Sequence, residues 1–404
     1  MSKITAKYGL PVEVNFCRRC VMSNQKPNST VEYKYAPGTK KETISFDAEG
    51  VCAACHFAEY KDQTIDWAKR ERELAGLCDQ YRRNDGRYDC IVPGSGGKDS
   101  AFAAHVLKYK YGMHPLTVTW APHLYTDIGW RNFTNWIHIG GFDNILFTPN
   151  GRVHRLLTKL AFENLLHPFQ PFIFGQKNIG AKFALKFKVP LVFYGENQAE
   201  YGNNKPPAEN DIASVPAEFF STNDLSTVRL GGMLIKDLIK RHKINPNELG
   251  PYLPAPVGEL KKQKVKIHYL AHYLKWDPQE NFYYATKHTG FEANTERTEG
   301  SYSKYSSIDD KTDPFHYYTT LIKFGIGRTT YDAAQEIRNG KITREEGVAL
   351  VRRYDQEFPQ RYFKEFLEYI SLEEKAFWRL IDQGRSPHLW KKVGQEWQLR
   401  QPIT

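Results

Sequence analysis

The sequence predicts an α/β fold, in which helices cover both faces of a parallel sheet, with an N-terminal four-cysteine zinc segment and a C-terminal helical region. Three observations support this prediction. Short apolar runs alternate with helix-like segments between residues 88 and 197. Two Cys-x-x-Cys pairs precede these runs, and charged segments with helical periodicity occupy the last ~80 residues. We therefore expect three regions, at residues 1–60, 61–300 and 301–404.

The composition is that of a folded protein that binds anions. Of the 404 residues, 41% are hydrophobic and 25% are charged. No apolar run approaches the ~18 residues of a membrane span, and the first residues lack the apolar stretch of a secretory signal, so we expect a cytoplasmic protein. The net charge of +10 favours a nucleotide, a nucleic acid or an acidic sugar as ligand. A generally basic solvated surface would carry the same charge.

Four cysteines form the two pairs Cys17/Cys20 and Cys52/Cys55. In a reducing compartment such pairs are typical of zinc ligands, because a two-residue spacer places both sulfurs on one side of a turn. Four thiolates complete a tetrahedral shell, which predicts a structural site that helps a short segment to fold. A redox dithiol and a coincidental spacing are the alternatives, and His56 is an alternative ligand.

The elements follow in order from the end of the cysteine segment. Residues 64–86 predict a charged helix that ends in a left-handed cap at Gly86, with Cys78 as a small buried side chain. Buried strands are expected at 88–93, 114–121, 143–149 and 191–197. Helices are expected at 100–112, 130–141, 152–166 and 179–190. The pattern loosens from about residue 203 to residue 320.

Ligands of parallel α/β sheets bind at the carboxyl ends of the strands. In this sequence that edge would bring together Ser95, Thr119 and the stretch from Gly195 to Asn197. We therefore expect a binding site at this edge.

The strand at 88–93 leads into the sequence GSGGKDS, residues 94–100, which has the chemistry of a phosphate cradle. Its glycines allow the backbone to approach phosphate oxygens, and the following helix would direct its N-terminal N–H groups at an anion. Ser95 and Ser100 add hydroxyl donors, Lys98 adds a positive charge, and Asp99 adds a carboxylate for Mg²⁺. The stretch matches neither GxxxxGK[ST] nor GxGxxG. An ordinary glycine-rich turn is the alternative.

What the stretch resembles is the SGGxDS loop of the adenine nucleotide alpha hydrolase superfamily, the PP-loop ATP pyrophosphatases. That resemblance implies a PP-loop ATP pyrophosphatase domain that cleaves ATP to AMP and pyrophosphate with Mg²⁺. It implies that Ser95, Gly96, Gly97, Asp99 and Ser100 hold the pyrophosphate and the metal ion, with Lys98 at the variable position of the motif.

A wider resemblance concerns the acceptor of the AMP group. The motifs CRRCVMSNQKP, FDAEGVCAAC, SGGKDSAFAAHVLK, VTWAPHLYTDIGWRNF, LVFYGENQAEYG and LIKFGIGRTTYDAAQEIRNGK together resemble the N-acetyl sugar amidotransferases of bacterial surface-polysaccharide and nonulosonic acid synthesis. The resemblance implies that an acetamido group of an acidic nucleotide-linked sugar becomes an acetamidino group through an adenylyl imidate. It also implies ammonia from a separate glutaminase and a cyclase-like partner. The sequence fits this, since no glutaminase triad is evident in it.

The resemblance also implies roles for single residues. Lys98, Lys177, Lys323 and Arg328 are the candidate active-site cations, the last two because they flank the glycines of KFGIGR, which a helix-ending turn would equally explain. Thr119 and Gly195 would border the nucleotide. Glu196 and Asn197, in YGEN, would contact sugar, AMP or metal, or else cap the next turn. The candidate substrate contacts, which a solvated loop would also present, are Ser303, Lys304, Tyr305 and Asp309.

Two other functions remain open from the sequence. A tRNA-modifying enzyme with the same loop, a thiolase or a lysidine-type ligase, also fits the basic charge and the paired cysteines. Thiolation usually requires reactive cysteines near the ATP site, and Cys90 is unpaired in the sequence, so nucleic acid is not the expected partner. A zinc-bearing nucleotide-sensing scaffold would have no use for an intact SGGKDS.

Overall fold

A six-stranded sheet runs through the centre of the computed structural model, which describes residues 4–28, 35–217, 221–222 and 224–404. The strand order is β3-β2-β1-β4-β8-β5, and every pairing is parallel except that of β5 with β8. The predicted α/β class with a mostly parallel sheet is therefore confirmed. The strands are β1 (Cys90–Pro93), β2 (Pro115–Trp120), β3 (Asp143–Phe147), β4 (Leu191–Tyr194), β5 (Ser214–Pro216) and β8 (Lys266–Tyr269).

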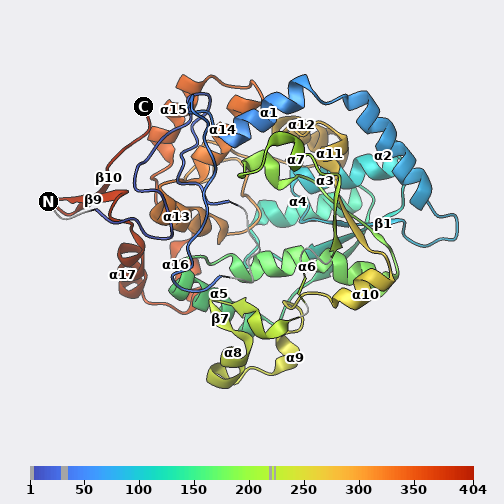
Figure 1. Ribbon diagram of the computed structural model, residues 1–404. Helices are drawn as coiled ribbons and strands as arrows, with labels where there is room; N and C mark the ends of the chain where they lie inside the picture. The colour runs from blue at the N-terminus through green and yellow to red at the C-terminus, as the bar shows by residue number, and fades with distance from the viewer. Residues whose placement is uncertain (1–3, 29–34, 218–220, 223) are drawn as a thin grey trace.

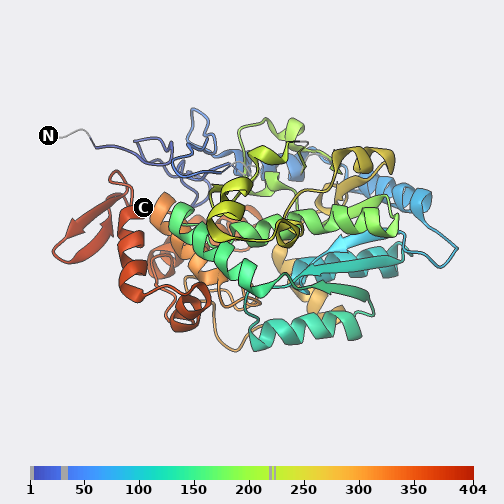
Figure 2. The same cartoon turned by 90° about the horizontal axis from the view of Figure 1, so that it is seen from below.

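Helices cover both faces of this sheet, and each face has its own apolar core (Figure 2). Side chains alternate between the cores along a strand, so Ile91 belongs to the first core and Val92 to the second. The helix α6 (Gln170–Phe187) packs over β1, β2 and β4 on the first face. The helices α3 (Lys98–His105), α4 (Asp127–His138) and α12 (Pro278–Thr289) contribute to the second core.

Four helices differ from their expected limits by more than one residue. The helix α4 begins and ends three residues before the predicted helix at 130–141. The helix α2 (Trp67–Tyr81) begins after the cap Asp66 and ends at Arg82, which has an extended backbone, so the expected end at Gly86 is wrong. The helix α3 continues into one π-helical turn, η2 (Val106–Lys110). The helix α6 begins nine residues earlier than the predicted helix at 179–190, because its first turns pack their aromatic side chains against the sheet core.

The chain between β4 and α12 adds small elements around the sheet. It supplies the two strands β8 and β5, which the loose sequence pattern did not reveal. The remaining elements are η3 (Gln198–Tyr201), α7 (Pro207–Asn210), η5 (Leu225–Thr227), β6 (Arg229–Leu230), β7 (Met233–Leu234), α8 (Ile235–His242), α9 (Pro246–Leu249), α10 (Val257–Lys262) and α11 (Leu270–Tyr273), with α5 (Gly151–Leu165) preceding α6.

The C-terminal region is helical, as predicted, and lies to one side of the sheet (Figure 1). It ends in an antiparallel hairpin that the sequence pattern did not indicate. Its elements are α13 (Asp313–Phe324), α14 (Arg328–Arg338), α15 (Arg344–Tyr354), α16 (Phe363–Ile370), α17 (Glu374–Gly384), β9 (Trp390–Val393) and β10 (Glu396–Leu399).

The cysteine-bearing segment and α1 (Ala53–Gln63) lie beside α14 and α15 (Figure 1). Cys17, Cys20 and Val21 share one apolar cluster with Ala333 of α14 and Val348 of α15. Residues 1–3 and 29–34 of the expected 1–60 region lie outside the described residues. Among the described residues, no helix is long and apolar enough to cross a membrane.

Candidate active site

The glycine loop after β1 is shaped by close packing. Gly96 has a φ of +81°, and a Cβ there would lie 2.7 Å from the Cα of Phe133. A Cβ on Gly94 would lie 2.3 Å from the Cβ of Ser100. Gly97 is the N-cap of α3 and provides no side-chain cap for its N–H groups. The loop therefore presents backbone donors at a helix N-terminus, which suits a pyrophosphate group.

This loop stands where the strand order of the sheet reverses. The strand β1 pairs with β2 on one side and with β4 on the other. Chain connections leave β1 and β4 in opposite directions, which opens a crevice at their carboxyl ends. The loop at 94–97 follows β1, and Glu196 follows β4 by two residues.

A cavity of about 410 Å³ occupies this position. Its floor is the glycine loop, and its walls come from segments far apart in the sequence. The size is that of a small-molecule site in proteins, which usually enclose roughly 300–1,000 Å³. Predicted site residues that line it are Ser95, Gly96, Gly97, Lys98, Asp99, Glu196, Ser303, Tyr305, Asp309 and Arg328.

Asp99 is held from two sides at the start of α3. Lys98 Nζ lies 2.6 Å from Asp99 Oδ2, and the side chain of Asn281, in α12, donates to Asp99 Oδ1 over 3.0 Å. Asn281 is 2% exposed. These two contacts fix the carboxylate toward the cavity, where it would hold a cation.

Glu196 is the second carboxyl group of the cavity. Burial and, to a smaller extent, the negative charge of Asp99 raise its pKa to about 7, while Lys98 opposes the shift. Tyr201 donates its hydroxyl to Glu196 Oε1 over 2.9 Å. Two carboxyl groups that repel each other in a buried site provide the oxygen ligands that Mg²⁺ prefers. The donor set therefore fits Mg²⁺.

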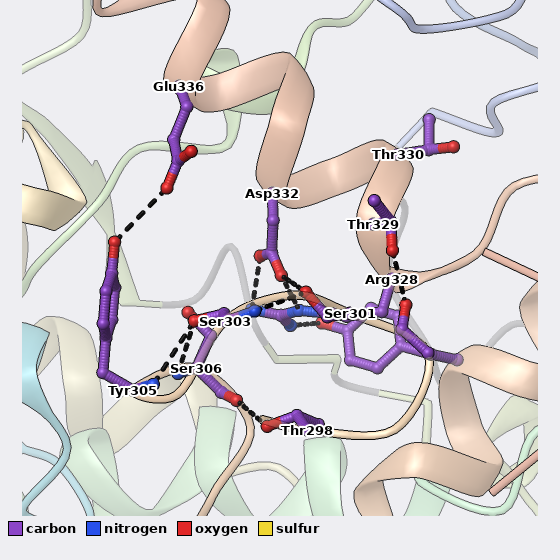
Figure 3. A network of polar contacts seen from close by, with 12 residues as sticks. Thr298, Ser301, Ser303, Tyr305, Ser306, Arg328, Thr329, Thr330, Asp332 and Glu336 are labelled. Atoms are coloured by element: carbon purple, nitrogen blue, oxygen red, sulfur yellow. Dashed lines mark hydrogen bonds and ion pairs between the residues drawn. The ribbon is translucent and has the colours of Figure 1, made fainter. Parts of the chain in front are cut away.

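Arg328 begins α14 and brings a buried positive charge to the cavity (Figure 3). Its Nη2 lies 2.9 Å from Asp332 Oδ1, and its guanidinium lies 4.5 Å from the ring centre of Tyr317. Ser301 donates to Asp332 Oδ2 over 2.6 Å. Because these partners hold the guanidinium in place, it can face an anionic group without reorganising.

The loop before α13 faces α14 across the same space (Figure 3). Tyr305 donates its hydroxyl to Glu336 Oε1 over 3.3 Å. The side chain of Ser303 accepts the backbone N–H of Ser306 over 3.2 Å, which gives the loop its turn. Burial raises the pKa of Asp309, and the adjacent Asp310 raises it further. The loop is thus fixed by its own hydrogen bonds.

Other predicted site residues lie outside this cavity. Asn197 caps η3, since it accepts the N–H of Ala199 and donates to the carbonyl of Asn210. Lys323 donates to the carbonyl of Leu165. Thr119 is buried in β2 and accepts from Asn144.

The remaining four predicted site residues, Gly195, Ser100, Lys304 and Lys177, make contacts within the fold and do not line the cavity. A Cβ on Gly195 would meet the Trp276 ring at 2.6 Å. Ser100 donates to the carbonyl of Gly97, and Lys304 donates to the carbonyl of Thr295. Lys177 lies in α6, and its carbonyl accepts from Tyr194. The predicted residues Ser95 to Asp99 of the glycine loop therefore line the cavity. The predicted cations Lys177 and Lys323, and the strand-end residues Thr119 and Gly195, do not.

The cavity also contains residues that the sequence pattern did not reveal. They are polar side chains to which the sequence assigned no role, although four of them stand within the motifs quoted above, namely Asn132, Tyr201, Asp332 and Glu336. They are Asn132, Tyr201, Gln279, Asp313, His316, Tyr317, Asp332 and Glu336.

The four paired cysteines converge as expected. Their sulfur atoms lie within 4.8 Å of one another, with Cys17 Sγ 3.8 Å from Cys55 Sγ and Cys20 Sγ 3.7 Å from Cys52 Sγ. A tetrahedral zinc site with Zn–S bonds of about 2.3 Å has S–S edges of about 3.8 Å. The residues therefore fit zinc. His56 pairs instead with Asp47 at 2.7 Å.

Known proteins resemble parts of this chain. Residues 299–403 match the family described as LPS biosynthesis protein WbpG-like, C-terminal domain. That match covers about a quarter of the chain. Ser303, Tyr305, Asp309 and Arg328, which line the cavity together with the glycine loop, belong to the matched residues.

Two further proteins are similar to other fractions of this chain. An uncharacterized protein of Methanocaldococcus jannaschii is 30% identical over 79 residues, which is 19% of this chain and 27% of that protein. The chain thus spans about a quarter of the length of this curated relative. The structure of NMN synthetase from Francisella tularensis is similar over 50% of this chain and 93% of its own, with 12% identity and a TM-score of 0.26.

Proposed function

We propose that the chain is an ATP-dependent, AMP-forming amidotransferase that converts the acetamido group of an acidic nucleotide-linked sugar into an acetamidino group. The observation that carries this proposal is that the glycine loop and the WbpG-like domain line one cavity. A phosphate cradle opposite a second set of polar side chains suits the joining of a nucleotide to an acceptor. The likeness to LPS biosynthesis proteins favours a sugar as that acceptor.

The reaction has two stages, activation and substitution. First the amide oxygen of the sugar attacks the α-phosphorus of ATP, a new O–P bond forms, and the bond to pyrophosphate breaks. Ammonia then adds to the carbon of this adenylyl imidate and loses a proton, after which the C–O bond breaks and AMP leaves with the electron pair. Since activation resides in the substrate, the protein's task is to position reactants and to stabilise charge.

Residues of the cavity suit these tasks. The backbone N–H groups of the loop at 95–97 would bind the departing pyrophosphate, and Arg328 would face a phosphate or carboxylate. Asp99 and Glu196 are the residues that would hold Mg²⁺, which supplies charge neutralisation to pyrophosphate when bound. Asp313, whose pKa burial raises to about 7, would accept the proton that ammonia loses.

The source of ammonia would be a separate glutaminase with a cyclase-like subunit. The proposal is supported by the state of the cysteines, since all six are buried and four of them form the metal cluster. A glutaminase of the cysteine type needs an accessible, activated thiolate. Burial raises the pKa of Cys78 to about 12 and that of Cys90 further above its usual range, which also disfavours the tRNA thiolation alternative.

The decisive experiment mixes the protein with ATP, Mg²⁺, ammonium and a nucleotide-linked diacetamido uronic acid. We expect AMP and pyrophosphate in equal amounts and a sugar product in which NH replaces an oxygen, detected by mass spectrometry. Asp99→Asn should abolish both, whereas Asp127→Asn, an exposed carboxylate outside the cavity, should not. AMP formation that depends on tRNA and ignores the sugar would refute the proposal.

A further inference from the structure

A second cavity, of about 180 Å³, opens on the surface beside the first. Its mouth includes the exposed residues Gly38 and Gln383, and its inner wall includes His167 and Lys323. None of these residues lines the catalytic cavity. The second cavity is too small for a nucleotide but large enough for a few water-sized molecules.

The helix α13 connects the two cavities along one face. Asp313 and His316 line the catalytic cavity, Thr320 lines a small cavity beside it that His316 also lines, and Lys323 lines the second cavity. These four side chains share one stripe, because their spacings of three, four and three residues keep them on the same face of an α-helix. Polar side chains on this face of α13 therefore extend from the second cavity, which opens on the surface, to Asp313, the proposed proton acceptor.

Two stacked imidazole rings separate the cavities. The ring centres of His167 and His316 lie 5.0 Å apart, and Phe169 stacks on His316 at 5.1 Å. The Nδ1 atom of His316 is buried and has no hydrogen-bond partner among the residues that the structure describes. An unpaired buried nitrogen of this kind suits a small molecule that can hydrogen-bond.

We propose that the second cavity and the His167–His316 pair form a side entrance by which ammonia reaches the catalytic cavity. The inference rests on the proposed function, in which ATP and a nucleotide-linked sugar occupy the catalytic cavity together. A cavity of about 410 Å³ has the size of a site for one drug-sized ligand, so two nucleotide ligands would leave no free volume in it. The third reactant then needs a path that the first two do not block.

The charges along this path favour neutral ammonia over ammonium. Two lysines, Lys41 and Lys323, and one carboxylate, Glu163, line the second cavity, so the charges of its lining side chains sum to a positive value. Burial lowers the pKa of His316 far below its usual value, and His167, Lys323, Arg328 and Lys41 lower it further. An ammonium ion would meet these like charges and lose its hydration, whereas ammonia would not.

A bulky label attached at the surface opening of the second cavity should block the entrance. Gln383→Cys is labelled with fluorescein maleimide, which reacts selectively because the six native cysteines are buried. The control is labelled Lys364→Cys, where the native side chain is 91% exposed and lines neither cavity. We expect the label at position 383 to raise the KM for ammonium about tenfold and to leave the KM for ATP unchanged.

A second pair of variants tests the inner part of the path. Thr320→Leu adds bulk that would block it, and Thr320→Val, which keeps the size of the side chain, is the control.

The outcomes separate the two proposals. If the unlabelled protein forms no AMP with any N-acetylated nucleotide sugar, the proposed function fails, and the entrance fails with it. If AMP forms and the KM for ammonium is unchanged in both labelled Gln383→Cys and Thr320→Leu, only the entrance is refuted. A rise in the KM for ammonium confined to these two proteins, absent from both controls, supports it.

Discussion

At the scale of single residues, the cavity is dominated by carboxyl groups that are buried with too few cations. Burial raises the pKa values of both Glu196 and Asp313 to about 7, and it also raises that of Asp309. Arg328 opposes the shift of Asp313, and Lys98 opposes that of Glu196. The ligand-free protein therefore keeps protons in its cavity that bound cations would displace.

Glu196 should make the free energy of unfolding depend on pH. Its pKa is about 7 in the folded protein and 4.5 ordinarily, so the folded state binds more protons between these values. Its contribution to stability is thus present below pH about 4.5 and is lost as the pH rises to about 7. In thermal denaturation from pH 4.5 to 8, Glu196→Gln should gain in Tm over the unmodified protein as the pH rises. Exposed Glu345→Gln should not, and parallel curves would contradict the assignment.

Asn281 should hold the Asp99 carboxylate in position in the cavity. Its amide lies 3.0 Å from Asp99 Oδ1, so Asn281→Asp places a second carboxyl group at hydrogen-bond distance. Like charges at this distance raise the pKa of the pair. We expect the acid limb of the pH profile of AMP formation to move to higher pH, with a loss of about tenfold in kcat/KM at neutral pH. Asn281→Leu should lower the rate without moving the profile, and an unmoved profile in both variants would contradict the contact's role.

At the scale of elements, the glycine loop is the part that local sequence predicts best. One continuous motif identifies it, and the apolar runs and helices around it alternate without interruption. Its glycines also pack against Phe133 and Trp136 of α4, which no local pattern predicts. Strand β8 is as long as β1 and β4, but it was missed because Lys266 and His268 interrupt its apolar pattern, and its partner β5 is only three residues long. The strand β8 is placed by its pairing with β4, and β5 by its pairing with β8, rather than by a local pattern.

The site residues divide in the same way. Ser95 to Asp99 were predictable because one continuous motif contains them. Asn281 was missed because it precedes an aromatic run that reads as core. Lys323 was placed in the cavity because it stands near Arg328 in the sequence, yet the two belong to different helices. Distance in the sequence does not determine which way a helical side chain points.

Two neighbouring glycines of the loop should respond differently to alanine. Gly96→Ala places a Cβ 2.7 Å from the backbone of Phe133 at positive φ, so the loop must move. We expect a loss of about 1–3 kcal/mol in the free energy of unfolding and no AMP formation. At Gly97 the nearest atom to a Cβ is 3.6 Å away. Gly97→Ala should therefore keep its stability in urea denaturation and lose only ATP affinity. Equal stability of both variants would contradict this account of the loop.

At the scale of the whole molecule, the cysteine-bearing segment is connected to one wall of the cavity around the glycine loop. Arg338 Nη2 donates to the carbonyl of Glu200 over 3.1 Å, and its Nη1 lies 4.0 Å from Cys20 Sγ. Lys61 pairs with the Glu200 carboxylate at 2.6 Å in a buried setting. Glu200 adjoins Tyr201, which donates to Glu196. The cysteine segment thus supports one edge of the cavity.

Removal of the metal should therefore affect both stability and catalysis. With the four thiolates unclamped, the segment loses its hold on α14 and α15. We expect a strong zinc chelator to release one zinc per chain, to lower the Tm, and to weaken binding of Mg²⁺ and ATP measured by calorimetry. Cys78→Ala, outside the cluster, should lower the Tm but retain the metal. Full ATP affinity in the zinc-free protein would contradict this connection.

The wide separation of the cavity walls along the chain has a consequence for biosynthesis. Ser95 and Glu336 face the same cavity, yet more than half of the chain lies between them. Because a ribosome delivers the chain from its N-terminus, the nucleotide loop emerges long before the helices that complete its surroundings. A partly synthesised chain contains the glycine loop but lacks the later residues that line the same cavity. Under the proposed function, the chain therefore cannot form AMP until translation is nearly finished.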